Sequence, residues 1–299
     1  MSRMIVIICT FRRSSSLGAC LDSLTSQATS DSHLLVVGVK EDPASGDVAA
    51  ERGVPFVAQA KPEGIASARN FGIKSTTDPF VAFIDDDARA RRGWTEALLG
   101  AFESNEVGGV GGPVFDTRKG IQYVFEWQVD PFGISHAVRD HQPLMGMLPT
   151  INGCNMAFSR FALDKIGGFD PYYRYYYDET DVCVRLAQHG FSVRFENLAI
   201  VDHDFAEGPT RNRFLYNSTR TRAYFSVKNF GNTIPIARLL AGQVRLVRND
   251  IRAYRGSRER YRGLRGGLKA IREACTGRIH GIVDGVQVLN GQSFHPMSV

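Results

Sequence analysis

Three consecutive carboxylates follow an uninterrupted apolar run in the first third of the chain. Residues 80–84 are apolar, and Asp85, Asp86 and Asp87 come directly after them. A run of this length is typical of a strand buried on both faces of a parallel sheet, and ligands bind beyond the carboxyl ends of such strands. Extended backbone points Asp85 and Asp87 the same way, so their charges repel each other unless a cation lies between them. The pair therefore predicts a divalent metal carrying a phosphorylated ligand, with an acidic turn that only ends the strand as the alternative.

A second acidic group opens a predicted helix. Asp178 is placed to cap a helix over residues 178–189, which Gly190 ends, and Glu179 and Asp181 lie in its first turn. Acids in the first turn of a helix complement the positive end of its dipole, which is one interpretation of this group.

The remaining patterns predict the elements that position these acids. Strands are expected where β-branched and aromatic residues cluster, over residues 4–10, 34–39, 54–58, 80–84, 107–114, 151–158, 191–196 and 198–201. Helical spacing or helix signals are found over residues 17–24, 67–74, 161–166, 178–189 and 212–228. The alternation of strand and helix favours an α/β fold with a parallel sheet covered by helices. Residues 115–149 show no clean period and are predicted as an irregular loop over the site.

The composition is that of a globular protein. Of 299 residues, 43% are apolar, which supports one large α/β domain or two small ones. The five cysteines are scattered and form no CxxC pair, which argues against both a disulfide framework and a cysteine metal site. The apolar run at the N-terminus is too short for a membrane helix and lacks a cleavage site. The sequence therefore predicts a cytoplasmic protein.

The positive charge is concentrated near the C-terminus. The chain carries a net charge of +5, but residues 236–284 hold twelve basic and four acidic side chains, so the remainder carries −3. A solvated helical extension, a nucleic-acid contact and an anionic membrane surface are the three interpretations of this tail. Basic residues interleaved with Leu, Ile and Tyr favour the membrane surface, and therefore a peripheral position at the inner face of the cell membrane. No recognised nucleic-acid-binding module accompanies the charge.

Six short segments, in this order, resemble motifs of the family 2 inverting glycosyltransferases with the GT-A fold. The segments are residues 10–13, 64–73, 83–87, 152–158, 167–170 and 178–181. The resemblance covers roughly residues 4–230 and implies a Rossmann-like mixed sheet flanked by helices. It divides the chain into a nucleotide-sugar-binding half (1–110), an acceptor-binding half (111–230) and a basic helical extension (231–299). One departure is that Lys40 and Glu41 precede Asp42 where the family has an acid at the strand end, which leaves the nucleotide base open.

The resemblance implies roles for individual residues. The expected donor-binding residues are Thr10, Phe11, Arg13, Asp42, Arg69, Asp85 and Asp86. The expected ligands of Mn²⁺ or Mg²⁺ are Asp87 and His203, and the expected acceptor contacts are Trp127, Asn155 and Tyr177. Glu179 corresponds to the catalytic base, with Asp178 as the alternative because the order of the two acids is reversed here.

The sequence therefore predicts a metal-dependent inverting glycosyltransferase that uses a nucleotide-diphospho-sugar. UDP is the first choice of nucleotide, with dTDP and GDP as alternatives, and the acceptor is a glycan, a lipid-linked sugar or a small molecule. A non-catalytic nucleotide-sugar-binding protein with the same fold is the competing hypothesis. A dinucleotide-dependent oxidoreductase is set aside because no GxGxxG follows the first strand.

Overall fold

The chain forms two compact units. A computed structural model describes residues 3–27, 30–124, 126–138, 144–204, 214–256 and 263–291. Unit 1 consists of Met1–Gln128, His136–Arg174 and Asp178–Glu207, and unit 2 consists of Val129–Ser135, Tyr175–Tyr177 and Gly208–Val299. Two short segments from the middle of the sequence therefore belong with the C-terminal part of the chain.

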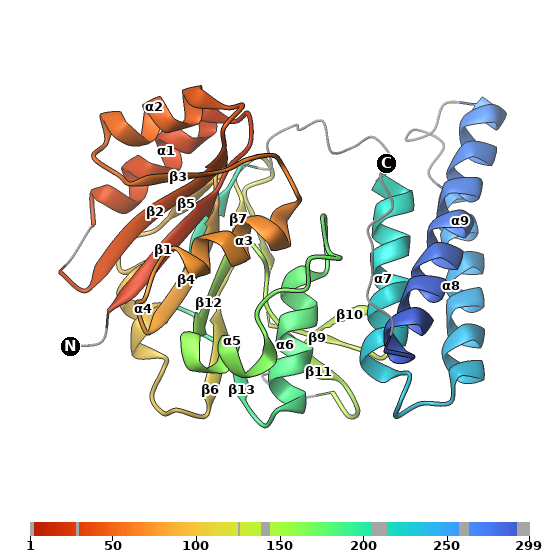
Figure 1. The fold of residues 1–299 in the computed structure, drawn as a ribbon. Helices are drawn as coiled ribbons and strands as arrows, with labels where there is room; N and C mark the ends of the chain where they lie inside the picture. Colours follow the sequence, from red (N-terminus) through yellow and green to blue (C-terminus); the bar gives the residue numbers. More distant parts are fainter. Residues whose placement is uncertain are drawn as a thin grey trace. The chain divides into compact units, whose positions relative to one another are not determined.

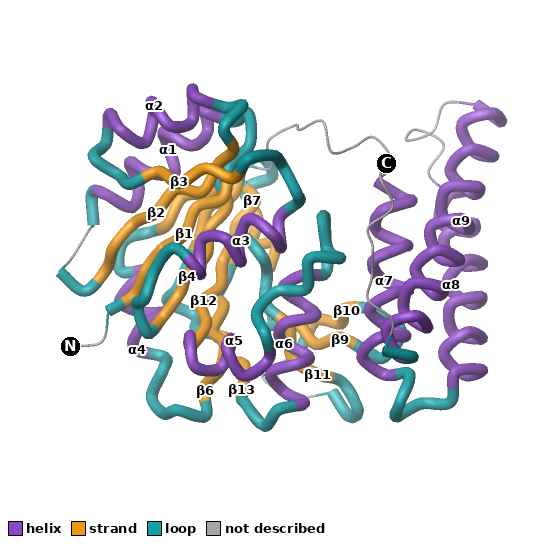
Figure 2. Tube along the Cα trace, in the orientation of Figure 1, coloured by secondary structure: helices purple, strands orange, loops and turns teal. Residues whose placement is uncertain are grey.

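Unit 1 is built on a seven-stranded mixed sheet (Figures 1 and 2). Its order is β13 (Ser192–Phe195), β6 (Val107–Gly111), β12 (Asn155–Ser159), β4 (Phe80–Asp85), β1 (Met4–Cys9), β2 (Ser32–Val39) and β3 (Phe56–Gln59). The neighbours β4, β1, β2 and β3 run parallel, whereas β12 is antiparallel to both β4 and β6. In the register Cys9 faces both Val37 and Asp85, so the carboxyl ends of three parallel strands meet at one edge. The predicted α/β class is confirmed.

Within the described residues, unit 1 has six helices. They are α1 (Ser14–Thr25), α2 (Pro43–Glu51), α3 (Ile65–Lys74), α4 (Trp94–Gly100), α5 (Arg160–Ile166) and α6 (Asp178–Gln188). The sequence patterns missed α2 and α4. Helix α2 buries only Ser45 and Ala49, so it has almost no apolar stripe to detect. Helix α4 has seven residues and is fixed by the fully buried Trp94 and Leu98, one turn apart.

Two small sheets replace the irregular loop that was expected over residues 115–149. The first has the order β5 (Ala88–Ala90), β14 (Val201–His203), β7 (Val114–Asp116) and β8 (Ile121–Val124). The second has the order β10 (Ser135–Ala137), β9 (Trp127–Val129) and β11 (Leu148–Thr150). The prediction was wrong because strands of three or four residues are too short to show a period. The short strand expected within residues 107–114 is β6, and Gly112 and Pro113 separate it from β7.

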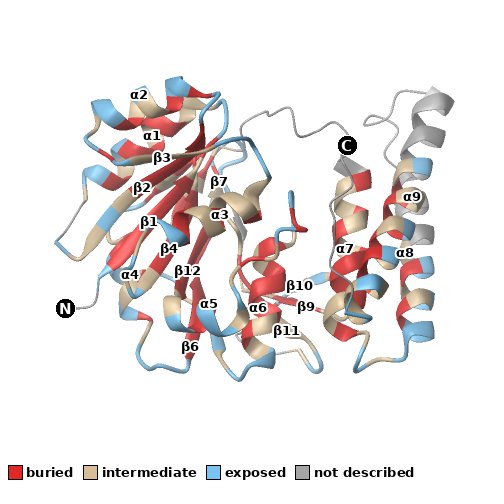
Figure 3. Ribbon diagram, in the orientation of Figure 1, coloured by how far each residue is buried: buried red, intermediate tan, exposed pale blue. Residues whose placement is uncertain are grey.

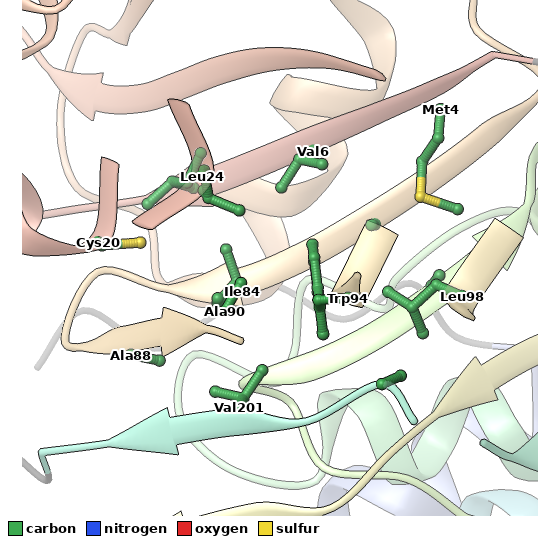
Figure 4. Packing of buried hydrophobic residues seen from close by; sticks show 14 of the residues in the cluster. Met4, Val6, Cys20, Leu24, Ile84, Ala88, Ala90, Trp94, Leu98 and Val201 are labelled. Carbon is green, nitrogen blue, oxygen red and sulfur yellow. The ribbon is translucent and has the colours of Figure 1, made fainter. Parts of the chain in front are cut away.

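The central strands of the seven-stranded sheet are buried on both faces (Figure 3). Alternate residues of β1, including Met4 and Val6, join the core cluster that contains Trp94 of α4 and Leu24 of α1 (Figure 4). Ile7 points to the other face, where it packs against α3: a Cβ added at Gly72 would lie 2.8 Å from its side chain. Continuous apolar strands are the expected result of burial on both faces.

The part of unit 2 that the structure describes has three helices, and α7 belongs among them. They are α7 (Phe214–Phe230), α8 (Ile236–Gly256) and α9 (Gly263–Leu289). The sequence placed a boundary at residue 230, but α7 packs along α9 through glycines spaced four residues apart. A Cβ added at Gly281 would lie 2.1 Å from the carbonyl oxygen of Arg220, and Arg220 also pairs with Asp284 at 2.9 Å. Among the described helices, none is long and apolar enough to cross a membrane.

Gly281→Ala should destabilise unit 2. The added methyl group would collide with backbone of α7, and overpacking of this kind costs about 1–3 kcal/mol. Thermal unfolding followed by circular dichroism checks this. Gly100→Ala is the matched control, because no atom lies within 4 Å of the Cβ that it would add. Equal melting temperatures for the two variants would contradict the close packing of α7 on α9.

Candidate active site

The loop after β1 is tied to the loop after β4 through Asp86. Thr10 donates a hydrogen bond to Asp86 Oδ2 at 2.7 Å, and Arg13 Nη1 contacts Asp86 Oδ1 at 3.1 Å. Burial raises the pKa of Asp86 to about 6, against the opposing effects of Arg13 and Thr10. Both carboxylate oxygens are thus engaged by the protein, and the donor contact expected of Asp86 remains a prediction.

Asp87 lies between a cation and an imidazole. Its Oδ2 is 3.0 Å from Arg13 Nη1, and its Oδ1 is 2.9 Å from Nε2 of His203. The antiparallel pairing of β14 with β5 sets His203 opposite Ala88, next to Asp87. Burial alone would lower the pKa of His203, but the bond to Asp87 and the charges of Asp85 and Asp87 raise it above its ordinary value. The structure therefore brings the two predicted metal ligands together.

Arg69 of α3 is the buried cation at the centre of the site. It is 4% exposed and pairs with Asp178 through Nη1, while Nη2 lies 3.5 Å from Asp85 and donates to the carbonyl of Gly153 at 2.8 Å. Its guanidinium also lies over the ring of Phe83, 5.7 Å from the centroid. One side chain thus joins the end of β4, the start of α6 and the turn before β12.

Glu179 follows Asp178 at the start of α6 and is half-buried. A Cβ added at Gly153 would lie 3.2 Å from Arg69 and 3.5 Å from Glu179 Oε2, so glycine leaves room for both side chains. Burial and the neighbouring charge of Asp178 raise the pKa of Glu179 well above its ordinary value, and Arg69 opposes this only in part. A carboxyl group with a raised pKa beside a strand-end acidic cluster suits a general base.

Asp42 accepts hydrogen bonds in the loop beyond β2. The backbone N–H of Arg12 donates to its Oδ2 at 2.6 Å, and Ser45 of α2 donates to the same oxygen at 2.7 Å. Arg12 has a φ of 57°, a left-handed conformation that is costly for a non-glycine residue and is common at functional sites. Phe11 beside it is 38% exposed, which is unusual for a large apolar side chain at a strand end. The donor roles expected of Asp42 and Phe11 stay predictions.

Three ligand-type side chains from different elements converge at the site. One donor atom each from Asp85, Cys154 and His203 lies within 4.8 Å of the other two. The hard oxygens of Asp85 and Asp87 and the imidazole of His203 fit Mn²⁺ or Mg²⁺. The sequence patterns missed Cys154 because its neighbour Asn155 was chosen from the same motif. Cys154 lies in the turn before β12, so strand alternation gave no signal for it, and its thiol as a possible metal ligand was the available one.

Asn155 is part of the core, and the acceptor role expected of it does not fit the structure. It is fully buried, and its Oδ1 accepts from Trp94 Nε1 at 2.8 Å. Its Nδ2 donates to the carbonyls of Pro113 and Ala199, at 3.0 and 2.8 Å. These bonds hold β12, α4 and the segments that lead into β7 and β14 together, so the side chain is structural.

The other two expected acceptor residues lie in different units. Trp127 in unit 1 is half-buried and packs against the pair formed by Val114 and Cys154. Tyr177 belongs to unit 2, where its hydroxyl donates to the carbonyl of Gly133 and accepts from Arg222 Nε. Their acceptor contacts stay predictions.

Asn70 of α3 and Arg185 of α6 hold the turn at residues 167–170 against the two helices. Asn70, one residue after Arg69, exchanges two hydrogen bonds with the backbone of Phe169, at 2.7 and 2.9 Å. Arg185 bonds Asp181 at 2.7 Å and also donates to the carbonyl of Gly168 at 2.7 Å. The turn at residues 167–170 is therefore fastened to both α3 and α6, the helices that carry Arg69 and Glu179.

The comparison with protein families identifies the class of the chain. The family described as "Glycosyltransferase like family 2" matches residues 2–226. The chain belongs to this family, as the resemblance of its motifs indicated.

Two relatives show how far the sequence similarity extends. A pre-mycofactocin glycosyltransferase of Mycobacterium tuberculosis is 31% identical over 143 residues, which cover 48% of this chain and 30% of that protein. A glucosyl-dolichyl phosphate glucuronosyltransferase of Haloferax volcanii is 28% identical over 223 residues, 68% of this chain and 69% of that protein. The match therefore spans less than a third of the mycobacterial relative and about two thirds of the archaeal one.

Solved structures confirm the GT-A fold. The mannosyltransferase PcManGT from Pyrobaculum calidifontis, in complex with GDP-Man and Mn²⁺, gives a TM-score of 0.57 at 15% identity, over 97% of this chain and 88% of that chain. GalNAc-T7 with UDP, GalNAc and Mn²⁺ also gives 0.57, at 14% identity over 76% of this chain and 50% of that chain.

Arg69→Met should destabilise unit 1 strongly. The variant keeps an apolar stem against Phe83 but leaves the buried Asp178 without its cation, which costs about 3–5 kcal/mol for a buried pair. Chemical denaturation followed by fluorescence measures the change. Arg52→Met is the control, because its pair with Asp22 lies at the surface and should contribute little. Equal effects of the two substitutions would show that Arg69 does not hold the site together.

Proposed function

We propose that the chain is a metal-dependent, inverting glycosyltransferase that moves a sugar from a nucleotide-diphospho-sugar to an acceptor hydroxyl. The observation that carries the proposal is that Arg69 links the start of α6, where Glu179 lies, to the acids at the end of β4. Arg69 touches Asp178, which precedes Glu179 in α6, and lies 3.5 Å from Asp85 at the end of β4. A base and a metal-type carboxylate cluster thus share one buried cation.

The donor nucleotide is assigned to the edge where β1, β2 and β4 end. Phe11 presents an exposed ring that suits stacking on a base, and Asp42 supplies a carboxylate beside it. Thr10 and Arg13 complete the loop after β1, where Arg13 places positive charge beside the phosphate region. UDP is the proposed nucleotide; dTDP and GDP are the alternatives.

Asp85, Asp87 and His203 would hold Mn²⁺ or Mg²⁺. A bound divalent ion there neutralises negative charge as the nucleoside diphosphate leaves. Arg13 already lies between Asp86 and Asp87, which limits the repulsion among these carboxylates before any ligand binds. The chain's own cations therefore preorganise the site.

Glu179 acts as the general base. It takes the proton of the acceptor hydroxyl while that oxygen forms the new bond to the anomeric carbon and the diphosphate leaves from the opposite side. Attack opposite the leaving group inverts the configuration of that carbon. The carboxylate of Asp178 is already engaged by Arg69, which favours Glu179 of the two acids.

The acceptor is assigned to a glycan or lipid-linked sugar. The name of the Haloferax relative states a dolichyl phosphate-linked acceptor, and the excess of basic residues over 236–284 suits an anionic lipid surface. Trp127 of unit 1 is the aromatic side chain proposed to contact the sugar, and the protein is proposed to lie peripherally on the membrane.

Glu179→Gln should abolish transfer and leave donor binding nearly unchanged. Glutamine keeps the shape but accepts no proton at the required step. Thermal shifts with UDP, dTDP, GDP and CMP, each with and without Mn²⁺, measure donor binding, since a ligand at about a hundred times its dissociation constant adds roughly 2.7 kcal/mol of stability. Product formation with the responding nucleotide-sugar measures transfer.

Glu96→Gln serves as the control, because Glu96 is exposed on α4. A metal-dependent shift with one nucleotide in all three proteins, with transfer lost only in Glu179→Gln, is the expected result. Transfer at the wild-type rate in Glu179→Gln would show that Glu179 is not the general base. A shift with a nucleotide and no transfer in the wild-type protein, whatever the acceptor, would favour a non-catalytic binding protein.

In the pH profile of kcat/KM, the loss of activity on the acid side should occur at a higher pH than for an ordinary glutamate. Glu179 works only when ionised, and its pKa is raised by burial and by Asp178. Activity should therefore fall as the pH drops through that raised pKa, well before the ordinary glutamate value of about 4.3 is reached. Thermal shifts with donor over the same range control for loss of binding. A rate that stays constant down to about pH 5 would contradict the raised pKa.

A further inference from the structure

A buried thiol faces the cluster assigned to the metal. Cys154 is 2% exposed, and its sulfur belongs to the trio with Asp85 and His203 in which the donor atoms lie within 4.8 Å of one another. The three residues come from the end of β4, the turn before β12 and the end of β14. The scattered cysteines had argued against a cysteine metal site, but two of the ligands here are not cysteines.

This donor set differs from one made of oxygens and imidazole alone. Mg²⁺ takes oxygen ligands almost exclusively, whereas a thiolate, an imidazole and a carboxylate together suit Zn²⁺ and similar thiophilic ions. Zinc bonds of about 2.0 Å to nitrogen and 2.3 Å to sulfur would place those two donors about 3.5 Å apart in a tetrahedral site. A small inward movement of the side chains satisfies this spacing.

We propose that Asp85, Cys154 and His203 form a binding site for thiophilic divalent ions such as Zn²⁺, and that occupation of this site blocks the transfer reaction. The inference deepens the proposed function, on which its inhibitory part rests, because the ion takes Asp85 and His203 from the Mn²⁺ or Mg²⁺ of the donor complex. Binding replaces the S–H bond of Cys154 with a metal–sulfur bond and releases one proton to solvent.

The surroundings of the trio are those of a supported metal site. Nε2 of His203 is bonded to Asp87 at 2.9 Å, so an ion held through Nδ1 would leave that bond intact. A ligating histidine fixed by a carboxylate is the common outer arrangement at zinc sites. Trp127 and Val114 pack against Cys154, so part of its surroundings is apolar.

Co²⁺ titration of the metal-free protein tests the site without any activity measurement. A cobalt–thiolate bond produces a ligand-to-metal charge-transfer band in the near ultraviolet, which oxygen and nitrogen ligands do not give. The band should appear with the wild-type protein at one equivalent of Co²⁺ and disappear in Cys154→Ala. Cys20→Ala, in which a buried thiol of α1 is lost, is the matched control and should keep the band.

No band in the wild-type protein, or a band that persists in Cys154→Ala, would overturn the proposal. Cys154→Ser provides a second folded variant should the alanine variant fail to fold, and it too should lose the band. These results do not depend on transfer, so they stand even if the proposed glycosyltransferase activity is absent.

Inhibition is then measured at fixed Mn²⁺ with added Zn²⁺. Transfer by the wild-type protein should fall, and Cys154→Ala should require at least ten times more Zn²⁺ for the same loss. Equal sensitivity of the two proteins would overturn the regulatory part of the inference, and an inactive wild-type protein would instead count against the proposed function.

Discussion

The buried guanidinium of Arg69 is the interaction on which the site depends. A cation at 4% exposure is stable only when its charge is compensated, and Asp178 and Asp85 supply that compensation. The two carboxylates need Arg69 in turn, because Asp178 is buried as well and burial raises the pKa of Asp85. The start of α6 and the end of β4 must therefore stay together.

The carboxylates of the site are divided between two arginines. Arg69 pairs with Asp85 and Asp178, and Arg13 pairs with Asp86 and Asp87. His203 is a third basic group, bonded to Asp87. This division follows from the sheet: β1 and β4 are neighbours in register, so the loop that carries Arg13 lies beside the acidic turn. The acid-rich site can thus exist before any ligand arrives.

The sequence predicted the strand-end acids and the acids of α6 because both follow from local patterns. The first pattern is a long apolar run followed directly by carboxylates, and the second is the start of a helix. The sequence patterns missed α2, whose nine residues bury little apolar surface, and the short strands between β6 and β12. Asn155 was chosen over Cys154 because a motif does not state which neighbour faces the core. The pairings of Asp86 with Thr10 and of Asn70 with Phe169 span 76 and 99 residues, and no local pattern reports such contacts.

The chain passes from unit 2 to unit 1 between Tyr177 and Asp178, with no linker at the crossing. Tyr176 and Tyr177 hold left-handed backbone conformations, at φ of 60° and 70°, and the bonds of Tyr177 to Gly133 and Arg222 help to maintain the second. A protein cut after residue 207 would therefore not be an independent N-terminal domain. It would lose the partner of Tyr177 in α7 and that of Pro131, whose carbonyl accepts from Ser226 at 2.7 Å. The left-handed conformations of Tyr176 and Tyr177, just before the start of α6, would then lose these stabilising bonds.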